Sequence, residues 1–222
     1  MNGINPIWLV AASLGLALVP LLLGAATSYI KVSVILSLLR GGFGAQGVPG
    51  ALVVASLATV LSLHIMGPVF EESWAAAGRI DFDTLAASGS LHSLQQLEPL
   101  LQPWKQFMKS HSGRRELQAV LDLESDRGPT GPQAHADRAP PEPSWRQALL
   151  AFILTELRQG FSMGFAMLLP FLVIDIVVAN ILAGLGMFML SPTLISLPLK
   201  ILLFIACDGW LLLSRGLVLS YQ

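Results

Sequence analysis

Charged side chains are scarce in this sequence, at 12% of 222 residues, whereas hydrophobic types make up 54%. A soluble globular domain carries about 25% charged residues, because its surface faces water. Lipid is a solvent in which leucine, valine, isoleucine and alanine can stay exposed. The composition therefore excludes an ordinary soluble domain and predicts an integral membrane protein.

Residues that carry out chemistry are equally sparse. The single cysteine, Cys207, excludes a disulfide within the chain. The four histidines are scattered, with no pair four residues apart and no CxxC, and this excludes the usual zinc motifs. The GxSxG, Walker A and GxGxxG motifs are missing, and no basic face for nucleic acid is present. We therefore expect no catalytic residue, no metal, no cofactor and no nucleic-acid partner, and we do not expect an enzyme.

What the sequence does contain is four long apolar segments that approach or exceed the roughly 20 residues needed to cross a bilayer as a helix. They cover residues 7–30, 48–70, 161–190 and 194–219. We expect an all-α membrane protein with four long hydrophobic helices in two helical hairpins. The first hairpin occupies residues 1–70, with a linker at 31–47, and the second occupies residues 159–222.

The polar region at 71–158 holds most of the charged residues and predicts a helical extramembrane insert between the second and third apolar helices. Within it, the Pro- and Gly-rich stretch 125–144 is too polar to bury a core and predicts a mobile loop. Lys31 and Arg40 lie in the predicted linker, so the positive-inside rule places that linker in the cytoplasm and the insert on the opposite side. A cleaved signal peptide remains an alternative interpretation of residues 7–23.

Four polar side chains interrupt the last two apolar segments: Asp175, Asn180, Lys200 and Asp208. An unpaired charge at bilayer depth costs several kcal/mol, so each needs a partner or water. We expect Asp175 and Lys200 to form an ion pair, within one subunit or between neighbours, that supports assembly. Two alternatives stay open, namely solvation of either charge at a helix end and a proton-relay role for Asp175.

Small residues predict where helices pack closely. Gly160 and Gly164 form a GxxxG pattern, and Ala179 and Ala183 repeat the spacing beside Asn180. Further on, Met187 and Met189 lie beside a Ser-Pro turn in GMFMLSP, where flexible thioethers suit an irregular partner. Ordinary core filling is the alternative for these methionines.

Two long stretches resemble the signature regions of the FliP/SctR family of type III secretion export-gate proteins. They are AFILTELRQGFSMGFAMLLPFLVIDIVVANILAGLGMFMLSP at 151–192 and PLKILLFIACDGW at 198–210. The matching signature positions include Glu156, Phe165, Pro170, Pro192, Pro198, Asp208, Gly209 and Trp210. Departures from the family pattern include Gly41 and Gly42, which replace a usual Asn-Ala pair and suggest a looser turn.

The resemblance implies a core subunit of the export gate in the bacterial inner membrane, multi-pass, with its large domain in the periplasm. It implies a homo-oligomer, pentameric in the family, together with two smaller membrane proteins of the SctS/FliQ and SctT/FliR types. The assembly would form the entrance channel for unfolded secreted proteins, with Met187, Phe188 and Met189 as a deformable pore seal. The chain begins at its first apolar segment, which favours the virulence-type, or injectisome, branch over the flagellar one.

Two other classes of function remain. A small-solute secondary transporter or ion channel subunit would use Asp175 and Asn180 as a coupling site, although no internal repeat is visible. A scaffold that only anchors other subunits would lack a pore-facing constriction.

Overall fold

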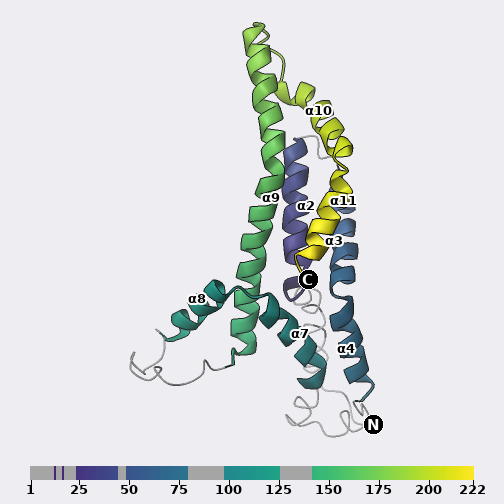
Figure 1. Cartoon of the computed structure of the whole chain (residues 1–222), viewed down its shortest axis with the longest axis vertical. Helices are drawn as coiled ribbons and strands as arrows, with labels where there is room; N and C mark the ends of the chain where they lie inside the picture. Colours follow the sequence, from purple (N-terminus) through teal and green to yellow (C-terminus); the bar gives the residue numbers. More distant parts are fainter. Residues whose placement is uncertain (1–12, 14–16, 18–23, 45–48, 80–97, 126–141) are drawn as a thin grey trace. The chain divides into compact units, whose positions relative to one another are not determined.

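The computed structural model describes residues 13, 17, 24–44, 49–79, 98–125 and 142–222. Within these residues the chain forms helices and no strands (Figure 1), as the sequence predicts. The helices are α2 (Tyr29–Phe43), α3 (Ala51–Ile65), α4 (Gly67–Ala77), α7 (Glu98–His111), α8 (Arg114–Ser125), α9 (Trp145–Gly184), α10 (Pro192–Ala206) and α11 (Gly209–Leu219).

The chain divides into two compact units. One comprises Met1–Ser28 and Met66–Thr155, here called the insert unit; the other comprises Tyr29–Ile65 and Glu156–Gln222, here called the hairpin unit. This division differs from the predicted domains, because the predicted first hairpin at 1–70 is split between the two units. Helix α9 contributes its first turns to the insert unit and its remaining length to the hairpin unit.

The largest difference from the sequence prediction concerns the linker at 31–47. Residues up to Phe43 belong to helix α2, which packs beside α3, and Lys31 is buried with 1% of its surface exposed. The cause is an apolar stripe at helical spacing, Val32, Ile35, Leu36 and Leu39, that is fully buried. A buried, paired lysine is not a loop charge of the kind that the positive-inside rule counts. Of the two residues that placed the linker in the cytoplasm, only Arg40 therefore still supports that orientation.

Helix α9 runs without interruption for 40 residues, and Pro170 lies inside it. Among the described residues it is the one helix that is long and apolar enough to cross a membrane by itself. The pairs α3–α4 and α10–α11 reach the required length only as bent spans, and the second is bent by 60°. Among the described residues the structure therefore supports one to three spans. The first of the four predicted segments lies mostly outside those residues.

The GxxxG pattern of α9 faces α2. A β-carbon added at Gly160 would lie 3.4 Å from the Lys31 Cα atom, and one at Gly164 would lie 2.5 Å from a Leu38 methyl carbon and 3.5 Å from the Ile35 Cα atom. The missing side chains thus allow the two helix backbones to approach closely. Asn180 and Ala183, further along α9, are exposed in this chain.

Replacing Gly164 with alanine is expected to destabilise the hairpin unit by about 1–3 kcal/mol, because the new methyl group overpacks the α2–α9 contact. Gly184→Ala is the matched control on the same helix, since a β-carbon there meets nothing within 4 Å. Thermal unfolding of the two purified variants in detergent measures the difference. Equal melting temperatures would contradict the assignment of this face to helix packing.

In the insert unit, helix α7 packs on α4. Trp104 donates an indole hydrogen bond to the hydroxyl of Ser73 at 3.0 Å and meets the ring of Phe70 edge-on at 5.3 Å. Pro103 lies inside α7. Most of the predicted loop at 125–144 lies outside the described residues.

Candidate functional site

The side chains of Asp175 and Lys200 meet in the hairpin unit. The Lys200 Nζ atom lies 2.6 Å from the Asp175 Oδ2 atom, and 3% of the Lys200 side chain is exposed against 32% of the Asp175 side chain. Ser196 donates a hydrogen bond to the Asp175 Oδ1 atom at 2.6 Å, and Lys200 donates a second one to the backbone carbonyl of Gly42 at 2.8 Å. The buried ammonium and the carboxylate are therefore both hydrogen-bonded, which offsets the cost of burying them.

The helices supply each partner of this network for a local reason. Ser196 and Lys200 are four residues apart on α10 and so share one helix face. Gly42 lies in the last turn of α2, where the final four carbonyls have no partner within the helix and attract a cation. The network consequently ties α9, α10 and the end of α2 together.

Gly42 matters for a further reason. A β-carbon there would lie 2.4 Å from a Leu168 methyl carbon and 2.8 Å from a ring carbon of Phe171. The expectation of a looser turn at Gly41 and Gly42 is wrong, because both residues are helical and the second is tightly packed. Glycine at this position lets α9 approach the end of α2.

A cluster of aromatic rings lies in the same unit as the network. The ring of Phe43 lies 5.0 Å from that of Phe171 and 5.4 Å from that of Phe204, and Phe204 lies 5.0 Å from Trp210. The first three of these aromatic residues are buried. Phe171 and Phe204 each lie four residues, about one helical turn, from one member of the ion pair, on α9 and α10.

The Asp-Gly-Trp signature forms the break between α10 and α11. Asp208 adopts a left-handed backbone conformation with φ of 48°, which is uncommon for a residue other than glycine. Gly209 has no room for a side chain, since a β-carbon would lie 2.3 Å from the ring of Phe204. The three residues therefore set the bend of this hairpin, and the side chain of Asp208 is exposed and not paired with Lys200.

A second buried ion pair was not predicted from the sequence. The Lys31 Nζ atom lies 3.1 Å from the Glu156 Oε1 atom, with 1% and 0% of the two side chains exposed. Burial lowers the pKa of Lys31 below its ordinary value, and the adjacent Glu156 carboxylate only partly opposes this shift. The signal was available, because Glu156 interrupts an apolar stretch and needs a cation, but the choice between basic residues requires the fold.

The residues of the predicted seal lie at the turn between α9 and α10. Met187, Phe188 and Met189 have 44%, 83% and 101% of their surface exposed, and Gly186 turns the chain there with φ of +74°. The alternative interpretation of the two methionines is core filling. Within a single chain they fill no core, because both side chains are exposed. This apolar tip, residues 187–189, offers a surface of soft side chains.

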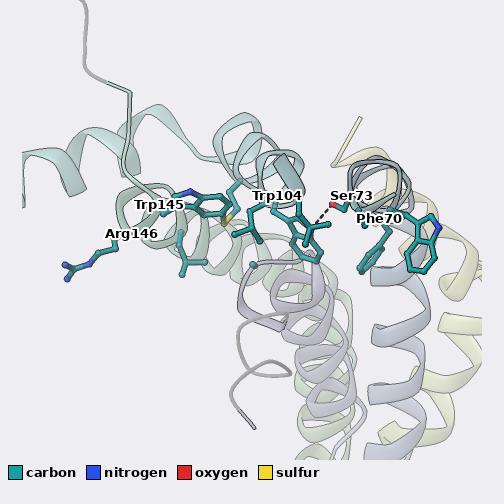
Figure 2. Close-up of a pocket in the computed structure, with 12 residues that line it drawn as sticks. Phe70, Ser73, Trp104, Trp145 and Arg146 are labelled. Atoms are coloured by element: carbon teal, nitrogen blue, oxygen red, sulfur yellow. Dashed lines mark hydrogen bonds between the residues drawn. The ribbon is translucent and has the colours of Figure 1, made fainter. Parts of the chain in front are cut away.

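An apolar groove of about 690 Å³ lies in the insert unit. Figure 2 shows Phe70, Trp104 and Trp145 along it, with Arg146 at its edge. The size and lining suit an apolar ligand or segment. In the part of the chain that the structure describes, no group of three histidine, cysteine or acidic residues is placed to hold a metal ion.

The sequence of this chain is similar to those of known proteins. The model of the FliP family matches residues 13–217. The Yop proteins translocation protein R of Yersinia pestis is 39% identical over 211 residues, covering 93% of this chain and 92% of that protein. The flagellar biosynthetic protein FliP of Rhizobium meliloti is 34% identical over 206 residues, covering 93% and 80%.

A third relative, the hypersensitivity response secretion protein HrcR of Ralstonia nicotianae, is 33% identical over 226 residues and is covered along its whole length. Relatives with virulence-associated secretion names thus stand beside flagellar ones. The resemblance inferred from the two signature stretches is confirmed, and the chain belongs to the FliP family of type III secretion and flagellar export-apparatus proteins.

Proposed function

We propose that this chain is a non-catalytic core subunit of a type III secretion export gate in the bacterial inner membrane, with its polar region at 71–158 in the periplasm. It forms a homo-oligomer, pentameric as in the family, with two smaller membrane proteins of the SctS/FliQ and SctT/FliR types. The assembly is the entrance channel for unfolded secreted proteins. The observation that carries this proposal is the exposed apolar tip at 187–189.

The tip suits a seal for physical reasons. A fully exposed Met189 and a largely exposed Phe188 are unfavourable in water, so they need to be covered in the working state. Copies arranged around one axis would bring equivalent tips together and cover them. The thioethers of such a ring of tips deform around varied peptides. When no peptide is present, the apolar ring of tips excludes water and ions.

The exposed face of α9 supports assembly. Phe161, Phe165, Leu169 and Val173 recur at four-residue spacing and are about half exposed. Gly160 and Gly164, which lie on the buried side, pack against α2. An apolar stripe left open on a long helix is the kind of surface that neighbouring subunits bury, and we assign it to contacts with them.

The transporter alternative is less well supported by the geometry. Asp175 is already neutralised by Lys200 and held by Ser196, and Asn180 is exposed on α9 rather than directed at the same point. A coupling site would need both groups to converge on a solute. Uptake of a small solute by proteoliposomes that contain this chain alone would favour the transporter.

Co-purification of this chain with the two smaller proteins, followed by electron microscopy, tests the gate. We expect a ring of several copies with a central channel and with the 187–189 tips at its narrowest level. A stable complex without a channel would contradict the gate and favour a scaffold. A monodisperse single chain that does not bind the two partners would contradict both.

A further inference from the structure

The next-to-last residue of the chain contacts the second buried ion pair. The hydroxyl of Tyr221 donates a hydrogen bond to the Glu156 carboxylate, and the Lys31 Nζ atom lies 3.9 Å from the centre of the Tyr221 ring. The three side chains come from three parts of the hairpin unit: α2, α9 and the turn that follows α11. Residues 65 positions apart in the sequence thus meet at one point.

This contact matters because the pair is almost entirely withdrawn from water. Lys31 and Glu156 are 1% and 0% exposed, and the attraction between buried charges repays their desolvation only when further hydrogen bonds satisfy them. Tyr221 supplies both kinds of support. Its hydroxyl donates a hydrogen bond to the Glu156 carboxylate, and the negative face of its ring lies against the Lys31 ammonium.

Backbone hydrogen bonds to the preceding helix hold Tyr221 in place. The backbone amides of Ser220 and Tyr221 donate to the carbonyls of Leu217 and Val218, so the helical turn continues past the end of α11. Burial together with the nearby Glu156 carboxylate raises the pKa of the Tyr221 hydroxyl. The hydroxyl therefore remains a donor at any pH at which the protein is handled.

We propose that Tyr221 is a positioning residue that orients Glu156 toward Lys31 and closes this ion pair from solvent, so that the C-terminal turn fastens α11 to α2 and α9. The inference does not depend on the proposed gate function. It concerns how the hairpin unit is held together.

Amine labelling of the purified protein in detergent, read by mass spectrometry, tests the closure. In the unaltered protein we expect Lys31 to react far more slowly than Lys109, whose side chain is 43% exposed. Tyr221→Ala should raise the labelling rate of Lys31 about tenfold, the factor that corresponds to losing about 1.4 kcal/mol of closure. Gln222→Ala, a change at the exposed neighbour, should leave the rate unchanged.

Lys200 separates local opening from general unfolding. Its side chain is 3% exposed in the other ion pair of the same unit, so it should stay unreactive if Tyr221 acts on Lys31 alone. Equal increases at Lys31 and Lys200 in Tyr221→Ala would show general unfolding and overturn the positioning role. An unchanged Lys31 rate would overturn the closure.

Tyr221→Phe divides the two contributions of the side chain. The ring over Lys31 remains and the hydrogen bond to Glu156 is lost, so the rate at Lys31 should fall between those of the unaltered protein and Tyr221→Ala. The phenylalanine variant should also fold more securely than the alanine one, because the half-buried ring is kept. A phenylalanine variant that matches the unaltered protein would overturn the role of the hydroxyl in orienting Glu156.

Discussion

Asp175→Ala is expected to destabilise the hairpin unit by about 3–5 kcal/mol and to prevent assembly, because it leaves the Lys200 ammonium buried without a counter-charge. Lys200→Ala is expected to cost less. It leaves a carboxylate that is one-third exposed and still accepts the hydrogen bond from Ser196, so water can reach it. The sequence alone would rank the two changes equally.

The measurement is a double-mutant cycle on the melting temperature in detergent and on co-purification with the smaller partners. For a chain of this length 1 kcal/mol corresponds to roughly 2–4 °C, so Asp175→Ala should lower the melting temperature by about 6–20 °C. The double variant Asp175→Ala with Lys200→Ala should be no worse than the worse single change, because no unpaired charge remains buried. Two defects that simply add would contradict the coupling.

Replacing both Met187 and Met189 with alanine is expected to increase ion leakage through the assembled complex and to leave its assembly intact. The two side chains are exposed in the single chain, so their loss removes no packing from the hairpin unit's core. What it removes is the soft apolar material of the proposed seal. Conductance of the purified complex in planar bilayers measures the leak.

The matched control replaces the same two residues with leucine, which keeps the apolar volume and loses the thioether. Leucine should keep the closed state tight and slow the passage of peptides, because its branched side chain adapts less well. If the alanine variant conducts no more than the unaltered complex, the seal lies elsewhere. Loss of assembly in the alanine variant would instead assign the tip to subunit packing.

Some of the candidate site could be predicted because a charge in an apolar segment is costly to bury without a partner. Asp175 and Lys200 interrupt apolar segments, and few opposite charges lie near enough in the sequence to serve as partners. GxxxG similarly indicates close helix approach wherever it occurs on an apolar helix. Predicting which helix approaches, and which other atoms join the pair, requires knowledge of the fold.

The linker shows why a local pattern can mislead. Lys31 and Arg40 flank an apolar stripe, and charges at that spacing also occur in a loop next to a membrane. The structure buries Lys31 against Glu156, which lies 125 positions away in the sequence and supplies the counter-charge. Without knowledge of that partner, a buried lysine and a solvated one look the same.

Hydropathy and periodicity by themselves determined that this protein is helical and largely apolar, and the two signature stretches determined its family. Both depend on residues that are close in the sequence. Only the tertiary structure decided that the carbonyl of Gly42 binds Lys200, 158 positions away, and that Tyr221 binds Glu156. Those contacts satisfy charges that must leave water when the helices pack, so they are fixed by which helices meet rather than by any local sequence pattern.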